Sequence, residues 1–337
     1  MTRRAGQAHR ILRQVGFALG AVGLLAAGSL AVVYATSERA LERRHAVSTD
    51  RSGTHARDVF PKLAVATPEL LERGRHLVTV VAQCTTCHGP DLAGREVADD
   101  PWIGRLSASN LTRGEGGVGG QLTDADWIAA LRRGVRRDGR SLLLMPAAQL
   151  ARLSDADLAA IVAYVRQVPP VDRVWPERRT GWLTRIVVAA GLAPDLIAAE
   201  QVAREAPVAR DVTPTATVAY GEYLVAVGGC RVCHRADLGG GLHPLSLPGE
   251  PVPPALTGRG AIAGWSRDEF ARAMRDGTTP DGRRLDREFM PWPAFAGLAD
   301  VEIEALWLYL GTLRSDEKSA GSPGTEFAVS GEGRARG

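Results

Sequence analysis

Cys84-Thr85-Thr86-Cys87-His88 recurs as Cys230-Arg231-Val232-Cys233-His234, and these two copies contain every cysteine of the chain. The spacing Cys-x-x-Cys-His is typical of c-type haem attachment. Residues three and four apart share one face of a helix, so both sulfurs and the imidazole of each copy point the same way. Two thiols on one side can each bond a vinyl group of a haem, and the adjacent histidine can ligate its iron. The motifs therefore predict two covalently bound haem c groups, held by Cys84, Cys87, Cys230 and Cys233.

Two other interpretations of Cys-x-x-Cys are a zinc site and a thiol redox site. A zinc ribbon pairs two such motifs at short range, whereas here a whole domain's length of chain separates Cys87 from Cys230. A thioredoxin-type site requires a βαβ context, and strand signals are nearly absent from this sequence. Haem attachment is the favoured interpretation of both motifs.

A haem iron held by one histidine needs a sixth ligand for low-spin electron transfer. Of the four methionines, Met145 and Met290 each precede a proline and lie at almost the same distance behind their motifs. Met274 falls on an apolar helical face, where we expect it to pack in the core. Histidine–methionine ligation raises the reduction potential and leaves no open position on the iron. The expected iron ligands are His88 and Met145 in the first copy, and His234 and Met290 in the second.

Two further histidines could take part in haem binding. His76 occupies the place of Tyr223 in the other copy, where a packing or surface contact is favoured over a bond to a haem propionate. His243 lies in a loop rich in Gly and Pro and competes only weakly with Met290 as an iron ligand.

The duplication extends beyond the motifs. Gly74-Arg75-His76-Leu77 matches Gly221-Glu222-Tyr223-Leu224, and residues 153–164 match residues 298–309. The fold class is therefore predicted to be all-α, with two homologous helical domains in tandem. The predicted segments are a cytoplasmic N-terminus (1–14), a transmembrane anchor (15–35), a tether (36–67), the first repeat (68–170), a connector with short helices (171–215), the second repeat (216–314) and a disordered tail (315–337).

Residues 15–35 contain no charged side chain and follow four arginines. At ~1.5 Å per helical residue they span roughly the ~30 Å hydrocarbon core of a bilayer. The preceding arginines favour a cytoplasmic N-terminus, and an uncleaved anchor is favoured over a signal peptide cleaved near Ala35. Either interpretation exports the remaining chain to a compartment that permits thiol oxidation. The net charge of +3 comes from the N-terminal region, so no basic stripe suggests a nucleic-acid partner.

Together these motifs resemble the membrane-associated cytochrome c subunits of periplasmic alcohol, aldehyde and sugar dehydrogenases, and related dihaem cytochromes c. The resemblance covers nearly all of residues 68–314 and implies cytochrome c folds, covalent haem at both motifs and the two histidine–methionine pairs given above. It is carried by residues 84–89, 110–112, 122–127, 130–135, 138–140, 145–146 and 153–158, and more loosely by residues 264–266, 281–283 and 290–291.

Two departures from the family pattern stand out. Several of these subunits have three haem domains and this chain has two, which leaves the physiological complex open. The first copy has Ser109 where the family usually has a proline, whereas the second keeps Pro254. A carbonyl in this region often accepts the second N–H of the proximal histidine and tunes its basicity. We therefore expect the two haems to differ in reduction potential.

The expected function is electron transfer by a dihaem cytochrome c on the periplasmic side of the cytoplasmic membrane. Its expected partners are the large subunit of a periplasmic dehydrogenase and a respiratory acceptor, either quinone or a terminal oxidase. No catalytic residues are assigned. The alternative is a haem enzyme, such as a peroxidase or a thiosulfate-oxidising cytochrome, with one catalytic haem. A sensor or assembly protein is disfavoured because no effector domain is evident.

Overall fold

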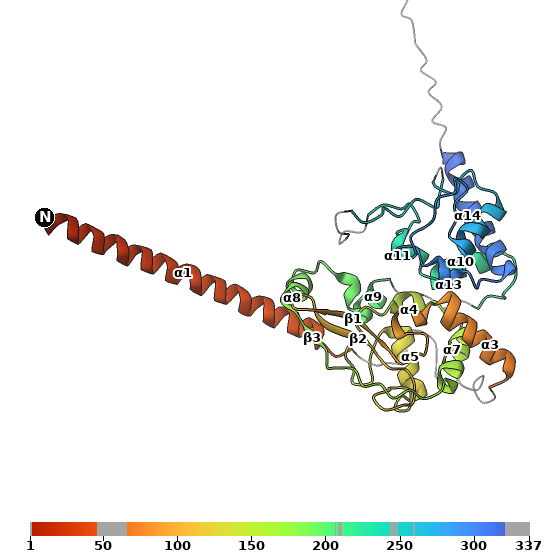
Figure 1. Cartoon of the computed structure of the whole chain (residues 1–337), viewed down its shortest axis with the longest axis horizontal. Helices are drawn as coiled ribbons and strands as arrows, with labels where there is room; N and C mark the ends of the chain where they lie inside the picture. Colours follow the sequence, from red (N-terminus) through yellow and green to blue (C-terminus); the bar gives the residue numbers. More distant parts are fainter. Residues whose placement is uncertain are drawn as a thin grey trace, which may run out of the picture.

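The structure is a computed structural model that describes residues 2–45, 66–205, 207, 211–242, 246, 249–258 and 260–320 (Figure 1). Most of the predicted tether, the predicted tail beyond residue 320 and His243 lie outside the described residues. A long N-terminal helix leads to two helical bundles, which correspond to the first and second repeats. The helices are α1 (Thr2–Leu41), α3 (Pro68–His76), α4 (Cys84–His88), α5 (Asp124–Arg133), α6 (Ala147–Leu150), α7 (Asp155–Gln167), α8 (Trp182–Ala189), α9 (Ala198–Glu205), α10 (Val218–Val227), α11 (Cys230–Cys233), α12 (Arg267–Asp276), α13 (Trp292–Phe295) and α14 (Asp300–Ala320), with a π-helix η2 (Leu77–Val81) and a 3-10 helix η3 (Pro194–Leu196).

The first and last helices of each repeat cross at a glycine. In the first repeat α3 meets α7 at Gly74, where an added Cβ would overlap the backbone of Ala160. In the second repeat α10 meets α14 at Gly221, where an added Cβ would overlap the backbone of Ala305. Only a residue without a side chain lets the two backbones approach so closely. The two crossings lie at equivalent sequence positions, and in both the backbone of an alanine faces the glycine.

The middle helices of the repeats also begin and end alike. Thr123 and Ser266 cap α5 and α12, each within a capping box completed by the acidic residue three positions later. Both helices end at a glycine in the left-handed conformation, Gly134 and Gly277, each with φ 63°. These local signals explain why the same helix forms twice.

A small antiparallel sheet departs from the all-α expectation. Its strands are β1 (Arg95–Asp100), β2 (Gly104–Ala108) and β3 (Arg179–Thr180), in the order β1-β2-β3. The Asp100 carboxylate accepts hydrogen bonds from the backbone N–H groups of Trp102 and Ile103, at 2.8 and 2.9 Å, and closes the β1–β2 turn. β1 is rich in Glu, Asp and Ala, which are poor strand formers, so little in its composition indicates a strand. The fold is predominantly helical with this one sheet in the described chain.

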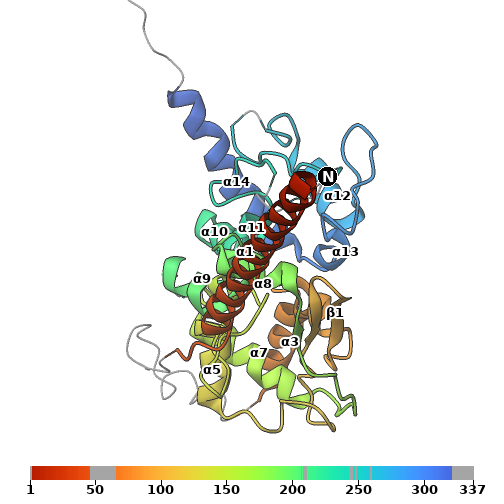
Figure 2. The same cartoon turned by 90° about the vertical axis from the view of Figure 1, so that its left-hand side faces the viewer.

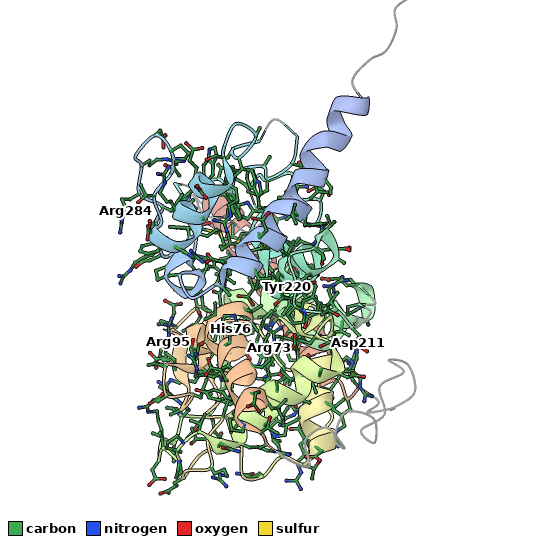
Figure 3. The ribbon with its side chains drawn as sticks, turned by 90° about the vertical axis from the view of Figure 1, so that its right-hand side faces the viewer. Arg73, His76, Arg95, Asp211, Tyr220 and Arg284 are labelled. Carbon is green, nitrogen blue, oxygen red and sulfur yellow. The ribbon has the colours of Figure 1, made fainter. Side chains whose placement is uncertain are left out.

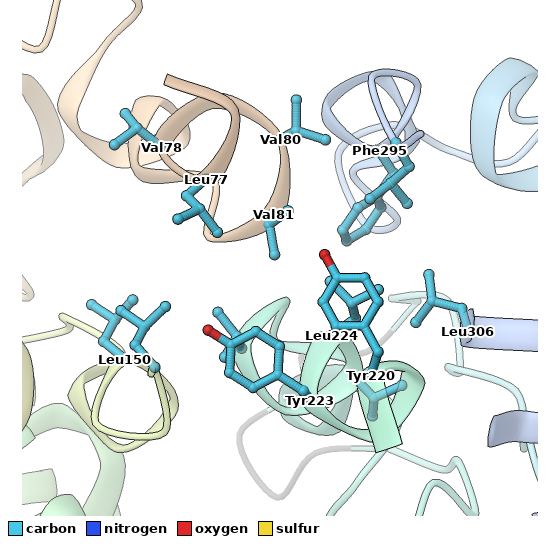
Figure 4. Close-up of a cluster of buried hydrophobic side chains, with 14 of the residues drawn as sticks. Leu77, Val78, Val80, Val81, Leu150, Tyr220, Tyr223, Leu224, Phe295 and Leu306 are labelled. Carbon is cyan, nitrogen blue, oxygen red and sulfur yellow. The ribbon is translucent and has the colours of Figure 1, made fainter. Parts of the chain in front are cut away.

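The two repeats pack reciprocally around one continuous apolar core (Figure 4). The short helix α13, which follows Met290, contacts η2, which leads into the first Cys-x-x-Cys-His motif. The short helix α6, which follows Met145, contacts α10, which leads into the second motif. Val80 of η2 lies against Gly297, just after α13, and Gln149 of α6 lies against Gly229. Each repeat thus supports the chain that enters the motif of the other.

α1 is long and apolar enough to cross a membrane over Arg13–Leu41, and the side chains of its most apolar stretch are not buried. The helix continues to Leu41, past the predicted end of the anchor at residue 35, because its last turns pack on the protein. Ser37 and Leu41 are buried there, and Glu42 pairs with Arg140 at 2.6 Å. Residues 36–41, predicted as the start of a tether, are therefore helical and docked. Figure 2 shows this C-terminal end of α1 beside α8.

The second repeat also extends further than predicted. α14 runs to Ala320, so residues 315–320, which were expected to belong to a disordered tail, are helical. In the connector, α9 packs against α5 and α6 of the first repeat, and α8 packs against α1. The connector is thus part of the folded structure in its described residues.

Candidate functional site

Each Cys-x-x-Cys-His motif forms a single helical turn behind a left-handed residue. Gln83, with φ 51°, precedes α4, and Gly229, with φ 77°, precedes α11. In α4, Cys84 is half-buried against the core and Cys87 is exposed; in α11, Cys230 and Cys233 repeat this pattern. None of the four cysteines forms a disulfide. Each turn therefore offers one inner and one outer sulfur beside its histidine.

The histidine of each motif is oriented by a backbone carbonyl. Nδ1 of His88 lies 2.8 Å from the carbonyl oxygen of Ser109, and Nδ1 of His234 lies 2.8 Å from that of Pro254. A carbonyl can only accept, so Nδ1 carries the proton and Nε2 keeps its lone pair. Burial lowers the pKa of both imidazoles, which favours the neutral form that binds metal. Both histidines are thus prepared to ligate iron through Nε2.

The serine at position 109 leaves this hydrogen bond in place. The acceptor is a backbone oxygen, which every residue type supplies, and the N···O distance equals that in the second repeat. The substitution of Ser109 for proline therefore gives no support to the expected difference in reduction potential.

The loop behind each histidine is fixed in the same way in both repeats. Leu111 N–H donates to the carbonyl of Leu92, and Leu256 N–H donates to that of Leu238, both at 2.8 Å. Leu92 and Leu238 both adopt positive φ, 56° and 60°. A left-handed leucine is strained and persists only where its surroundings impose it. This shared strain marks the loop as part of the site, a feature that sequence inspection missed.

The first repeat adds a buried amide that the second lacks. Asn110 is 1% exposed; its Nδ2 donates to the carbonyl of Val171 at 2.8 Å, and its Oδ1 accepts from the backbone N–H of Thr112 at 2.9 Å. The second repeat has Ala255 at this position. Asn110 therefore ties the loop that orients His88 to the chain after α7.

The inner cysteines are unsuited to act as thiolates. Burial raises the pKa of Cys84 to about 12 and that of Cys230 to about 11. A reactive thiol needs a lowered pKa, and a structural zinc site needs four thiolate or imidazole ligands. Across the described residues, no group of three or more His, Cys, Asp or Glu side chains could hold a metal ion. Thioether attachment to haem, by contrast, uses up both thiols of a motif.

The two methionines expected to ligate iron, Met145 and Met290, occupy equivalent positions in the two repeats. Met145 and Met290 are half-buried and pack against the core, each in a Met-Pro turn that leads into α6 or α13. In both turns the methionine carbonyl accepts a hydrogen bond from the backbone N–H two residues later, at 2.7 Å. Met274 is 7% exposed in the core face of α12, which confirms its expected packing role.

A large cavity lies between the repeats. Its volume is about 1320 Å³, and its lining includes Met145 of the first repeat together with Tyr223 and Cys233 of the second. Packed protein interiors contain few voids larger than a water molecule, whereas pockets for large ligands reach ~300–1,000 Å³. The space is therefore suited to a large flat group between the second motif and the Met-Pro turn of the first repeat.

A buried polar atom also fits a bound haem. The indole nitrogen of Trp127, on α5, is buried and has no hydrogen-bond partner in the structure. A buried donor without an acceptor is costly, and the propionates of a haem are acceptors. The donor sets, the cavity and this unpaired N–H are all compatible with haem.

His76 does not contribute to these sites. Its Nε2 lies 2.8 Å from a carboxylate oxygen of Glu302 in the second repeat. The favoured interpretation, a packing contact rather than a propionate bond, agrees with this position.

Comparisons with known proteins agree with this chemistry. Residues 69–165 match the family described as cytochrome C oxidase, cbb3-type, subunit III. The chain is 28% identical over 286 residues to the gluconate 2-dehydrogenase cytochrome c subunit of Pantoea cypripedii, covering 75% of this chain and 62% of that protein. It is 28% identical over 264 residues to the cytochrome c subunit of the quinone alcohol dehydrogenase of Gluconobacter oxydans, covering 69% of this chain and 50% of that protein.

A third relative is the fructose dehydrogenase cytochrome subunit of Gluconobacter japonicus. It is 30% identical over 148 residues, covering 42% of this chain and 30% of that protein. The chain thus matches less than two thirds of the length of each of these relatives. Residues 69–165 thus match a cytochrome c family model, and the chain is similar to the cytochrome c subunits of gluconate, alcohol and fructose dehydrogenases.

Proposed function

We propose that this chain is a membrane-anchored dihaem cytochrome c that carries single electrons from a periplasmic dehydrogenase to a respiratory acceptor, quinone or a terminal oxidase. Relatives named as cytochrome c subunits of dehydrogenases support the donor. An N-terminal helix long enough to cross a membrane supports the anchor. The periplasmic side follows from the arginines that precede the span and from haem attachment to thiols.

The proposal of two haem domains is supported by matched geometry in the repeats. Both proximal histidines bond a carbonyl at the same distance, both Met-Pro turns have the same hydrogen bond, and both pairs of outer helices cross at glycine. A family match covers only the first repeat, so the second haem is inferred from these equivalences. The proposed ligand pairs are His88 with Met145 and His234 with Met290.

The chain's own residues would hold each haem with little freedom to move. Two cysteines of one helical turn fix the porphyrin edge, and the carbonyl of Ser109 or Pro254 fixes the plane of the imidazole. The Met-Pro turn is braced by the short helix that follows it. When bound, the haem supplies a one-electron change between ferrous and ferric iron. Because a six-coordinate iron would keep both protein ligands in the two oxidation states, this change would require little rearrangement of the protein.

One observation carries the proposal most directly: an imidazole on a Cys-x-x-Cys turn with Nδ1 bonded to a carbonyl, present twice. The test is the mass of the denatured mature protein together with its optical spectra. We expect two added haem masses, and two low-spin irons in both the oxidised and the reduced protein. One haem mass would remove the dihaem assignment.

The same spectra discriminate a carrier from an enzyme. Two six-coordinate irons that do not react with hydrogen peroxide are expected of a carrier. A high-spin iron that reacts with peroxide would instead favour a haem enzyme, because substrate needs an open coordination position.

A further inference from the structure

The connector helix α8 lies against the C-terminal end of α1, the end that packs on the first repeat. The rings of Tyr34 and Trp182 are 6.4 Å apart, and the Arg185 guanidinium lies 4.2 Å from the centre of the Tyr34 ring. Arg185 also bonds Glu38 at 2.8 Å and the hydroxyl of Ser37 at 3.1 Å. These contacts place α8 beside the turns where α1 would leave the bilayer.

The tip of the β1–β2 hairpin is tied to the start of α8. The carbonyl of Trp102 accepts from the N–H of Leu183 at 3.0 Å, and the carbonyl of Ile103 accepts from the hydroxyl of Thr184 at 2.8 Å. Hairpin tip and helix therefore form one rigid surface.

This surface is apolar and uncovered. None of the residues of α8 is buried, and Trp102 and Leu192 are 68% and 58% exposed. The surface of a soluble protein seldom has a large contiguous apolar patch unless that patch is a binding site. We call this surface the juxtamembrane patch; it consists of Trp102, Ile103, Trp182, Leu183, Ile186 and Leu192, all exposed.

The anchor cannot swing freely relative to this patch. Ser37 and Leu41 are buried, and Glu42 pairs with Arg140 at 2.6 Å and with Arg178 at 3.1 Å. Because α1 is held by buried and ion-paired residues at its C-terminal end, it fixes the orientation of the first repeat relative to the membrane that α1 crosses. Figure 1 shows α8 on the side of the bundles from which α1 emerges, whereas α14 lies on the far side.

We propose that the juxtamembrane patch inserts into the lipid–water interface of the bilayer that α1 crosses. This inference rests on the membrane anchoring in the proposed function. Tryptophan and tyrosine rings favour the interfacial region, and a short helix with an apolar face and a basic residue lies in its plane. Because Leu183 and Val187 also line the cavity between the repeats, such insertion would hold that cavity beside the membrane.

The test is lipid photo-crosslinking of the full-length holoprotein in phosphatidylcholine nanodiscs without any dehydrogenase. The native cysteines are expected to be bonded to haem, so Ile186→Cys introduces one reactive thiol for a benzophenone maleimide. Leu308→Cys on α14 is the matched control, an exposed apolar residue at 37% exposure. Gly28→Cys reports the anchor itself, where an added side chain meets no neighbour. Leu192→Cys, outside α8, covers the case in which Ile186→Cys does not fold.

We expect Ile186→Cys and Leu192→Cys to give about tenfold more lipid adduct than Leu308→Cys, because contact with lipid is confined to the inserted face. If Gly28→Cys forms lipid adducts but positions 186 and 192 react no more than position 308, the patch does not insert; a protein partner would then be its occupant. If Gly28→Cys forms none, the anchor of the proposed function is wrong and the inference falls with it.

Discussion

His76 in the first repeat and Tyr223 in the second occupy equivalent positions, and each reaches across to an acidic residue of the other repeat. His76 Nε2 lies 2.8 Å from Glu302, and the Tyr223 hydroxyl donates to Asp157 at 2.6 Å. Asp157 and Glu302 are themselves equivalent, near the starts of α7 and α14. The contacts that each repeat makes with the other are therefore related by an approximate two-fold axis, as in a symmetric dimer.

The axis passes near Arg73 and Tyr220, which are equivalent and lie close together (Figure 3). Arg73 forms two bonds of 2.8 Å to Asp157, and its other nitrogen lies 3.4 Å from the Tyr220 hydroxyl. Tyr220 in turn donates to Glu302 at 3.1 Å. A buried network of this kind is stabilising only while every member has a partner.

This network predicts an acid-sensitive interface. Burial opposes the charged form of Glu302, but bonds from His76 and Tyr220 outweigh it, so the pKa of this carboxyl lies below its usual 4.5. A carboxyl with a lowered folded pKa stabilises the fold above its unfolded pKa, and this stability is lost as pH falls through the folded value. The free energy of unfolding should therefore decrease as pH falls below 4.5.

Glu302→Gln tests this assignment by denaturant unfolding at several pH values. The variant should be about 1–3 kcal/mol less stable at neutral pH, because a neutral amide weakens the hydrogen bonds that the buried carboxylate makes with His76 and Tyr220, and should lose part of the acid dependence. Glu304→Gln on the same helix is the control, since Glu304 pairs with the surface Arg267. Equal acid slopes in the two variants would contradict the role given to Glu302.

The glycine crossings predict large effects from one added methyl group. Gly74→Ala or Gly221→Ala would place a Cβ against the backbone of the facing helix, so each should cost about 1–3 kcal/mol or more. Gly264→Ala should be nearly neutral, because no atom lies within 4 Å of its added Cβ. Thermal unfolding of the three variants measures the difference, and a normal melting temperature for Gly74→Ala would show that the helices can separate without cost.

The axial assignment predicts selective spectral losses. Met145→Ala or Met290→Ala should each convert one haem to a form with an open or replaced ligand and leave the other low-spin. Met274→Ala should leave both spectra unchanged and reduce stability by about 2–5 kcal/mol, as expected for a truncated core residue. Magnetic circular dichroism of the three variants distinguishes these outcomes. Loss of a methionine ligand in Met274→Ala would reassign the second site.

The carbonyl at position 109 predicts a silent substitution. Ser109→Ala should leave the potential of the first haem unchanged, because His88 bonds the backbone oxygen and the serine side chain is exposed. Asn110→Ala should instead loosen the loop and cost about 1–3 kcal/mol, since it leaves buried partners unpaired. Redox titration and unfolding of both variants check the contrast. A shifted potential in Ser109→Ala would mean that the hydroxyl itself acts on the haem.

Local patterns were sufficient for much of the fold. The core position of Met274 and the apolar N-terminal helix are both properties of short segments, and the structure has them. The strand β1 was not evident because its Glu, Ala and Asp side chains are poor strand formers, and the hairpin is held by the Asp100 turn.

Contacts between distant segments could not be predicted from the sequence. The bond between His76 and Glu302 joins residues 226 positions apart, and no local periodicity reports it. The docking of residues 36–42 likewise depends on Arg140, Arg178 and Arg185, which lie far along the chain and become neighbours of Glu38 and Glu42 only in the folded protein. The strained Leu92 and Leu238 also depend on their surroundings rather than on their own preference.

The reciprocal packing of α6 and α13 has a consequence for dissecting this protein. A truncated chain that ends after the first repeat would leave Val80 and Val81 of η2 without Phe295 and the rest of their apolar cover (Figure 4). Such a fragment would expose apolar side chains and would be prone to aggregation. The two repeats are therefore not independent folding modules, because each covers apolar side chains that the other would expose on its own.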